Sequence, residues 1–217
     1  MKNIVAPVDN TDYLLIDNFV RETPFTIDGV AAEYTPNSAL WNWVTGGVTA
    51  APVGAASGGV TFAIGTSPTD FLGVDPAAKI TDLRGIWTLT TTAISAFEIG
   101  IASDLASGGV TNTLKVSFRR GNPDALTLQA KVAIYVDSVQ QSGVVSGYTD
   151  GTQFAVPSAA VTSIPFEITR TESSVTFKCF GQSKVVDLLT YRVDETYTGL
   201  TFNGLNQISG LSKLRCS

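Results

Sequence analysis

The side chains best suited to chemistry in this sequence are carboxylates, because the sequence contains no histidine. Without imidazole, Ser-His-Asp and Cys-His catalysis and histidine-ligated metal centres are excluded. Glu98 and Glu167 each stand in an alternating segment, on the face opposite its apolar neighbours. We expect two solvated surface carboxylates. The alternative is that they meet on an exposed sheet face and act as an acid–base pair.

Asp and Asn side chains near the N-terminus offer the oxygen ligands that calcium takes. The densest cluster is Asp9, Asn10, Asp12, Asp17 and Asn18, and a looser one is Asp70 with Asp75. Neither cluster has the spacing of an EF-hand loop, and such residues commonly hydrogen-bond their own backbone at turns. We therefore expect no cofactor, with Ca²⁺ at these loops as the alternative.

Aromatic residues provide a third candidate chemistry, the stacking of sugar rings. Trp41 and Trp43 flank Asn42, so a strand would place both indoles on one face. Paired tryptophans on a β face usually belong to the core, because each buries a large apolar area. If they instead form a sugar platform, the stacking residues are Trp41, Trp43 and the loop aromatics Tyr148 and Phe154.

The two cysteines are too few for a disulfide scaffold and are wrongly spaced for zinc. Cys179 stands in an apolar run and is expected to be a small buried strand residue. Cys216 is penultimate, and we expect a free thiol there. A Cys179–Cys216 bridge requires the last strand to lie beside the Cys179 strand.

Composition and charge argue against some classes of binding partner. The 217 residues carry a net charge of −5 with only 15% charged residues, which argues against nucleic acid. The one adjacent basic pair, Arg119-Arg120, precedes a turn and is expected to flank a hairpin. No apolar segment is long enough to span a bilayer, so no membrane association is expected. The N-terminus lacks the apolar core of a secretory signal, which predicts folding in a cytosol.

Alternation of apolar and polar residues dominates the chain and predicts strands. It is clearest in 97–102, 114–119, 126–136 and 166–170, with turn signals between these segments. Short alternating strands separated by turns favour a two-sheet sandwich or a barrel. We expect an all-β fold.

Three segments depart from this pattern. Residues 1–13 are expected to form an extended N-terminal arm, followed by a single β-sandwich domain over 14–217. Residues 45–60 carry no charge and are expected to form a long surface loop packed on the sandwich or on a neighbouring subunit. Residues 67–83 are the one place where a short helix is allowed. The candidate assembly contacts are Ile4, Val5, Pro7, Val8, Val48 and Val53.

Four stretches together resemble a concanavalin A-like jelly-roll domain of the laminin-G, lectin and glucanase superfamily, in the form common among bacteriophage virion proteins. They are Leu15–Arg21 (an opening "D-N-F-x-R" strand), Val116–Gly121, Pro165–Arg170 followed by Val175–Phe177, and Tyr197–Phe202 with the closing strand Ile208–Leu214. The resemblance spans residues 14–215. It implies a two-sheet antiparallel jelly-roll sandwich.

The same fold serves lectins, hydrolases and purely structural modules. Glycoside hydrolases of the superfamily carry paired acidic residues on one strand, as in Glu-x-Asp-x-x-Glu, and this sequence has none. We therefore expect no enzyme. The leading hypothesis is a structural bacteriophage virion protein, most specifically a capsid decoration or cement subunit, assembled in the host cytoplasm.

The decoration hypothesis implies other virion proteins as partners, namely the major capsid or tail protein, and a homo-oligomer. The alternative is a lectin-like, carbohydrate-binding module of a tail or head fibre that recognises a host surface glycan.

Overall fold

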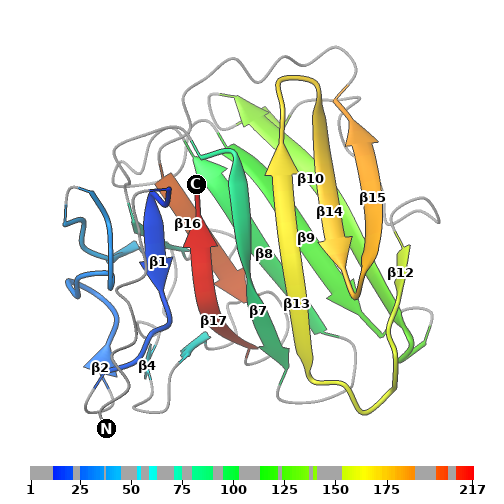
Figure 1. The fold of residues 1–217 in the computed structure, drawn as a ribbon, viewed down its shortest axis with the longest axis horizontal. Coiled ribbons are helices and arrows are strands. Elements are labelled where there is room, and N and C mark those ends of the chain that lie inside the picture. The colour runs from blue at the N-terminus through cyan, green and yellow to red at the C-terminus, as the bar shows by residue number, and fades with distance from the viewer. Residues whose placement is uncertain are drawn as a thin grey trace, which may run out of the picture.

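The computed structural model describes most of the predicted strands but not all of the connections between them. The described residues are 12–21, 25–36, 38–44, 53–54, 59–62, 71–74, 80–89, 95–102, 113–121, 124–136, 139–140, 153–188, 199–204 and 209–217. Within these ranges the regular elements are all β-strands (Figure 1). The expectation of an all-β fold is confirmed.

Nine strands form the first sheet, here called sheet I, in the order β15-β14-β13-β7-β17-β5-β4-β2, with β1 also paired to β17. Sheet I therefore joins the first described strand to the last. Its strands are β1 Leu15–Asp17, β2 Phe25–Thr26, β4 Val53–Gly54, β5 Val60–Phe62, β7 Asp82–Leu89, β13 Ser163–Arg170, β14 Ser174–Cys179, β15 Gln182–Asp187 and β17 Ser209–Cys216.

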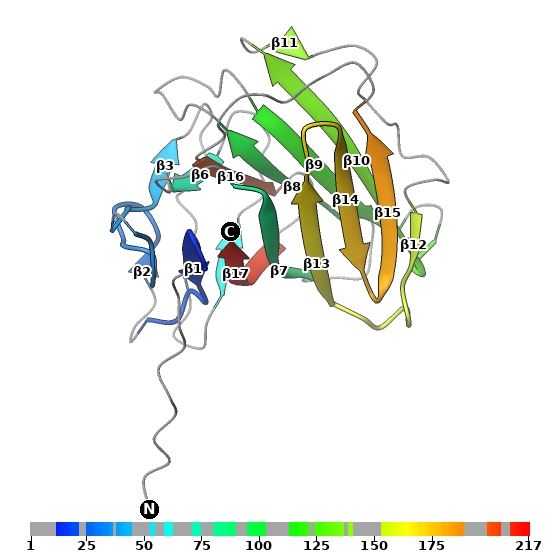
Figure 2. The same cartoon turned by 45° about the horizontal axis from the view of Figure 1, so that its top comes forward.

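Eight strands form the second sheet, sheet II, in the order β11-β10-β9-β8-β16-β6-β3, with β12 also paired to β10. Its strands are β3 Asn42–Val44, β6 Phe71–Val74, β8 Ser95–Ala102, β9 Thr113–Arg120, β10 Thr127–Val136, β11 Val139–Gln140, β12 Gln153–Ala155 and β16 Gly199–Gly204. The two sheets stack, with β13, β14 and β15 lying across β9 and β10 in both views (Figures 1 and 2).

Every pairing between these strands is antiparallel, and the chain crosses repeatedly from one sheet to the other. In sheet I, β7 lies between β13 and β17, both of which come much later in the sequence. These features make the molecule a two-sheet antiparallel jelly-roll sandwich, as expected. They also bring together residues that lie far apart in the sequence.

The core fills the space between the sheets, with aromatic rings at its centre. Phe118 of sheet II packs against Phe166 and Phe177 of sheet I, with ring centroids 5.7 and 6.2 Å apart. Trp87 of sheet I stacks on Phe97 of sheet II at 5.7 Å. All five side chains are at most 3% exposed. Because aromatic side chains bury large areas, this cluster explains why the alternating segments pack as two layers.

Two sequence expectations about local structure are corrected. The helix allowed over 67–83 is wrong where the chain is described, because Phe71–Val74 is strand β6 and β7 begins at Asp82. Phe71–Val74 hydrogen-bonds β16 on one side and β3 on the other, so tertiary pairing decides its conformation. Residues 45–60 are not a single loop, since β4 and the start of β5 lie within them and pair in sheet I.

The N-terminal arm expected over 1–13 lies largely outside the described residues. At its end, the amide of Leu14 donates to the carbonyl of Cys216 at 2.9 Å. Within the described part of the chain, no helix has the length and apolar character needed to cross a membrane.

Candidate functional site

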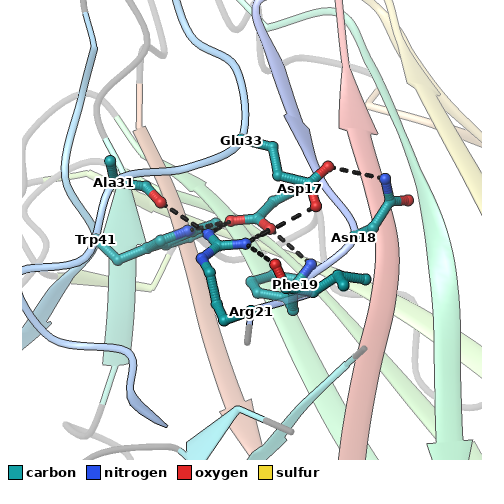
Figure 3. Close-up of polar contacts among 8 residues, drawn as sticks. Asp17, Asn18, Phe19, Arg21, Ala31, Glu33 and Trp41 are labelled. Atoms are coloured by element: carbon teal, nitrogen blue, oxygen red, sulfur yellow. Dashed lines mark hydrogen bonds and ion pairs between the residues drawn. The ribbon is translucent and has the colours of Figure 1, made fainter. Parts of the chain in front are cut away.

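The opening Asp-Asn-Phe-x-Arg segment builds a buried polar cluster beside β1 (Figure 3). Asp17 is fully buried, and its carboxylate accepts hydrogen bonds from the indole N–H of Trp41 at 2.8 Å and from the amide of Phe19 at 2.6 Å. Arg21 donates to both carboxylate oxygens, at 3.3 and 3.1 Å. A buried carboxylate is tolerated only when it is paired and hydrogen-bonded, and here both conditions hold.

Arg21 also links this cluster to the segment that precedes β3. It donates to the carbonyl of Ala31 at 2.7 Å and lies 3.8 Å from a carboxylate oxygen of Glu33. The other oxygen of Glu33 accepts from the side chain of Asn18 at 2.8 Å. The cluster therefore ties β1 to residues 31–41, which is a structural task.

This arrangement bears on the calcium alternative. Burial raises the pKa of the Asp17 carboxyl, while its hydrogen bonds and the Arg21 guanidinium lower it in part. Its oxygens already accept four hydrogen bonds, so they are not presented to a cation. Asp9, Asn10, Asp70 and Asp75 lie outside the described residues. In the described part, no three acidic or cysteine side chains are grouped as a metal centre would need.

Two of the four candidate sugar-stacking aromatics, Trp41 and Phe154, prove to be core residues. Trp41 is 0% exposed, hydrogen-bonded to Asp17 and packed on Phe19 with ring centroids 5.5 Å apart. Phe154 is 1% exposed. Neither ring offers a face to a sugar, because both belong to the core. Trp43 pairs in register with Leu72 of β6, but its side chain is not among those described; Tyr148 lies outside the described residues.

Most of the candidate assembly contacts remain predictions. Ile4, Val5, Pro7, Val8 and Val48 lie outside the described residues. Val53 belongs to β4, where its backbone pairs with Thr26 on one side and Thr61 on the other. At Val53 the expected loop is therefore a strand inside sheet I.

The alternative acid–base pair is ruled out by the topology. Glu98 belongs to β8 in sheet II, whereas Glu167 belongs to β13 in sheet I, with the core between the sheets. Glu167 instead forms an ion pair with Lys178 on the neighbouring strand. Alternation predicts that each residue stands in a strand, but the sheet to which that strand belongs is not encoded in local pattern.

The two thiols lie in the same sheet without approaching each other. Both are free and at most 2% exposed. β13 and β7 separate β14 from β17, so the cysteines are three strand spacings apart, about 14 Å. A disulfide requires Cα atoms within about 7 Å. Burial raises the pKa of both thiols to about 12.

The face of sheet II that points away from the core is polar, and several of its side chains are covered. Phe118, Val116 and Leu114 alternate into the core, which places Arg119 and Ser117 on the opposite face. Side chains on an outer sheet face are normally exposed. Here Ser117 is 2% exposed and Gln129 is 4% exposed. We call this surface the outer face of sheet II and define it by Ala96, Ser117, Arg119, Gln129, Lys131 and Ala133.

Two register rows run across this face. In the first, Arg119 on β9 lies opposite Gln129 on β10, which lies opposite Gln153 on β12. The guanidinium of Arg119 donates twice to the amide oxygen of Gln129, from Nε at 3.1 Å and from Nη2 at 2.7 Å. This fork holds both side chains in a defined position over the sheet.

The second row contains the backbone positions of Asn203, Glu98, Ser117 and Lys131, on β16, β8, β9 and β10 respectively. The two rows together place the guanidinium of Arg119, the amide of Gln129, the hydroxyl of Ser117 and the ammonium of Lys131 on one face of the sheet. Such groups hydrogen-bond polyhydroxylated ligands at pockets and clefts. The sequence singles out Glu98 and Arg119 in other roles and does not single out Ser117, Gln129 or Lys131, although the polar positions of 114–119 and 126–136 mark the outer face once β9 and β10 are paired.

Comparisons with known proteins identify the fold through structure alone. No family model and no curated protein sequence matches the chain. The laminarinase from Rhodothermus marinus has a similar structure, with a TM-score of 0.58, 10% identity, and coverage of 94% of this chain and 96% of that chain.

Two Bacillus proteins are also similar. The β-glucanase of Bacillus licheniformis gives a TM-score of 0.54 at 11% identity and covers 90% of this chain and 98% of its own. The carbohydrate-binding module CBM66 from Bacillus subtilis gives 0.52 at 9% identity, covering 82% and 95% respectively.

These structures overturn the expectation that the chain is not an enzyme. Glucanases, a laminarinase and a porphyranase share the architecture, so it is one on which glycan hydrolysis takes place in other proteins. The exclusion drawn from the missing Glu-x-Asp-x-x-Glu pattern is withdrawn. The fold that the resemblance implies is confirmed: the chain has the concanavalin A-like jelly-roll fold.

Proposed function

We propose that this protein binds glycan, and that the outer face of sheet II is its binding surface. The observation that carries the proposal is the burial of Ser117 and Gln129 on the side of the sheet that faces away from the core. Covered polar side chains set this surface apart from an ordinary solvated sheet face. The fold is shared with a carbohydrate-binding module and with glucanases, which agrees with this assignment.

The chemistry of the surface suits sugar hydroxyls. Arg119 and Lys131 are half-buried donors, and Gln129 contributes an amide held by the Arg119 fork. The fork lowers the cost of binding, because the two side chains are ordered before the ligand arrives. Ala96 and Ala133, 4% and 7% exposed, are small residues that lie on the same face as these groups.

A glycan array followed by calorimetry tests the proposal. The variants Arg119→Ala and Lys131→Ala remove donors from the outer face of sheet II. Arg84→Ala, on the outer face of sheet I, is the matched control, since it removes an exposed cation from the other side of the sandwich. We expect the affinity for a neutral oligosaccharide to fall about tenfold or more in the first two variants and to stay unchanged in the control.

Two outcomes would overturn the proposal. One is the absence of any glycan signal at high protein concentration. The other is an equal loss of affinity in Arg84→Ala and Arg119→Ala. Assaying the same oligosaccharide for new reducing ends, with the wild type and with Glu98→Gln, measures turnover separately. Loss of turnover with retained binding in Glu98→Gln would assign a catalytic role to that carboxylate.

We propose a virion role, most specifically capsid decoration, as the second candidate. Its support is in the sequence: the low charge, the uncharged segment 45–60 and the phage-like form of the four stretches that resemble the superfamily. Quantitative mass spectrometry of a purified particle tests it. Hundreds of copies per capsid would support decoration, whereas absence from any particle would refute it.

A further inference from the structure

A hollow of about 500 Å³ lies on the face of sheet I that points away from the core. Four cations from three strands line it: Arg84 on β7, Lys178 on β14, and Lys213 and Arg215 on β17. Among the described residues of its lining, Glu167 on β13 is the one carboxylate. We call this the basic hollow. It lies on the opposite side of the sandwich from the outer face of sheet II.

The register explains why positive charge accumulates here. Arg215 pairs with Arg84, Arg84 with Glu167, and Glu167 with Lys178, in one row across four strands. Two like charges directly opposite each other on neighbouring strands destabilise a sheet. In a protein with a net charge of −5, two facing arginines are therefore a cost that a bound anion would offset.

The neighbouring carboxylates neutralise only part of this charge. Arg84 bonds to Asp82 at 2.8 Å, and Lys178 is paired with Glu167. Arg215 lies 5.8 Å from the ring centroid of Tyr13. Among the described residues, neither Arg215 nor Lys213 forms an ion pair. In the described part of the chain, two carboxylates thus face four cations, which leaves an excess of two positive charges.

A β-bulge in β17 adds one of these cations. Ser212 pairs with Ile86 and Arg215 with Arg84, so Lys213 and Leu214 together lie opposite the single residue Gly85. Leu214 is buried and Lys213 is exposed, with a φ of +52°. This left-handed conformation is unfavourable for a non-glycine residue. Bulges of this kind re-aim a side chain next to functional sites.

We propose that the basic hollow binds the sulfate or carboxylate group of an acidic saccharide. The anion part of this proposal rests on the charge, register and shape of the hollow. The saccharide part rests on the proposed glycan-binding function. Guanidinium groups pair with sulfate and carboxylate through parallel hydrogen bonds, and Arg84 and Arg215 lie side by side to do so.

The test compares three ligands with the full chain by calorimetry: a sulfated oligosaccharide, its unsulfated counterpart and inorganic sulfate. Lys213→Gln and Arg215→Gln each remove one cation without adding bulk. Lys131→Gln reports on the outer face of sheet II, and Lys184→Gln, on β15 and outside both surfaces, is the matched control. We expect each hollow variant to weaken binding of the sulfated oligosaccharide about tenfold and Lys184→Gln to leave it unchanged. The affinity should also fall as salt is added.

Each other outcome is decisive. Failure of the sulfated oligosaccharide to bind, or binding that Lys213→Gln and Arg215→Gln leave intact, overturns the proposal. A loss in Lys131→Gln alone assigns the acidic saccharide to sheet II and also overturns it. Equal binding of inorganic sulfate overturns the saccharide part and keeps an anion site. Binding of the unsulfated oligosaccharide is a separate readout, so failure of the proposed glycan site is recognised independently.

Discussion

The indole N–H of Trp41 donates a 2.8 Å hydrogen bond to Oδ2 of Asp17, and both side chains are completely buried. This bond joins the first described strand to the residue that precedes β3. Since β1 lies in sheet I and β3 in sheet II, it helps to fasten the two sheets near the N-terminal side of the sandwich.

Replacement of Asp17 by Asn should destabilise the fold by about 2–4 kcal/mol. An amide nitrogen at this position would face donors from Arg21, Trp41 and the Phe19 backbone, and Arg21 would lose its buried partner. Urea denaturation measures the change. Glu33→Gln is the matched control, because Glu33 is a partly exposed partner of the same arginine and should cost less than about 1 kcal/mol. Equal losses in the two variants would contradict the account.

The same carboxyl gives a pH dependence with a definite sign. Burial raises the folded-state pKa of Asp17 above its ordinary value of 3.8. The folded state therefore holds the proton more tightly than the unfolded state, and this contribution to stability is lost as pH rises through the folded-state pKa. The stability advantage of the wild type over Asp17→Asn should thus shrink as pH rises from about 4. An advantage that grows over this range would show that the ion pair with Arg21 outweighs burial.

Both cysteines should be inert in the folded protein. Their thiols are buried and their pKa is raised to about 12, so the reactive thiolate is scarce at about pH 8. Labelling with a chromogenic disulfide reagent should modify neither thiol in buffer and both in denaturant. Rapid labelling in buffer at either position would place that residue outside the core. Detection of a disulfide would contradict the strand order of sheet I.

Gly85 is required because of Phe166, its register partner on β13. A Cβ at Gly85 would lie 3.0 Å from the Phe166 ring, which is buried and packed on Phe118. Gly85→Ala should cost about 1–3 kcal/mol. Phe166→Leu should relieve part of that cost in the double variant, which a double-mutant cycle detects.

Gly29→Ala provides the control for this cycle. Gly29 has a φ of +72°, and a Cβ added there would meet no atom within 4 Å, so its substitution strains the backbone alone. Phe166→Leu should then add to Gly29→Ala without coupling. Coupling of similar size in both cycles would contradict the steric explanation.

Local pattern is sufficient to predict the long strands. The alternation in 97–102, 114–119 and 126–136 corresponds to β8, β9 and β10, and the hairpin that follows Pro165 corresponds to β13 and β14. Each of these strands buries its apolar face and pairs with a neighbour. Short strands are harder to predict. Phe71–Val74 has too few residues to show a period, and its partners lie elsewhere in the chain.

The candidate sites depend on strand order, which local pattern does not contain. Arg84 and Arg215 meet because β7 and β17 are neighbours, although 130 residues separate them in the sequence. Glu98 and Glu167 fail to meet because their strands join different sheets. Neither outcome can be predicted without knowing which strands pair.

Part of the buried polar cluster could be predicted from the sequence. The pairing of two tryptophans on one β face favours a core position for Trp41, and that position is confirmed. Its partner Asp17 is a candidate calcium ligand by sequence, and its role as the buried acceptor for the indole was missed. The available signal was the position of Asp17 between Leu15 and Phe19, two apolar residues that are both buried.

The central claim is that glycan binds the outer face of sheet II, and NMR mapping tests it most directly. An isotope-labelled sample would be titrated with the neutral oligosaccharide that binds best. We expect the amide signals of Ala96, Ser117 and Gln129, on three neighbouring strands, to shift together while those of Arg84 and Lys178 stay in place. Shifts confined to sheet I, or no shifts at saturating ligand, would contradict the claim.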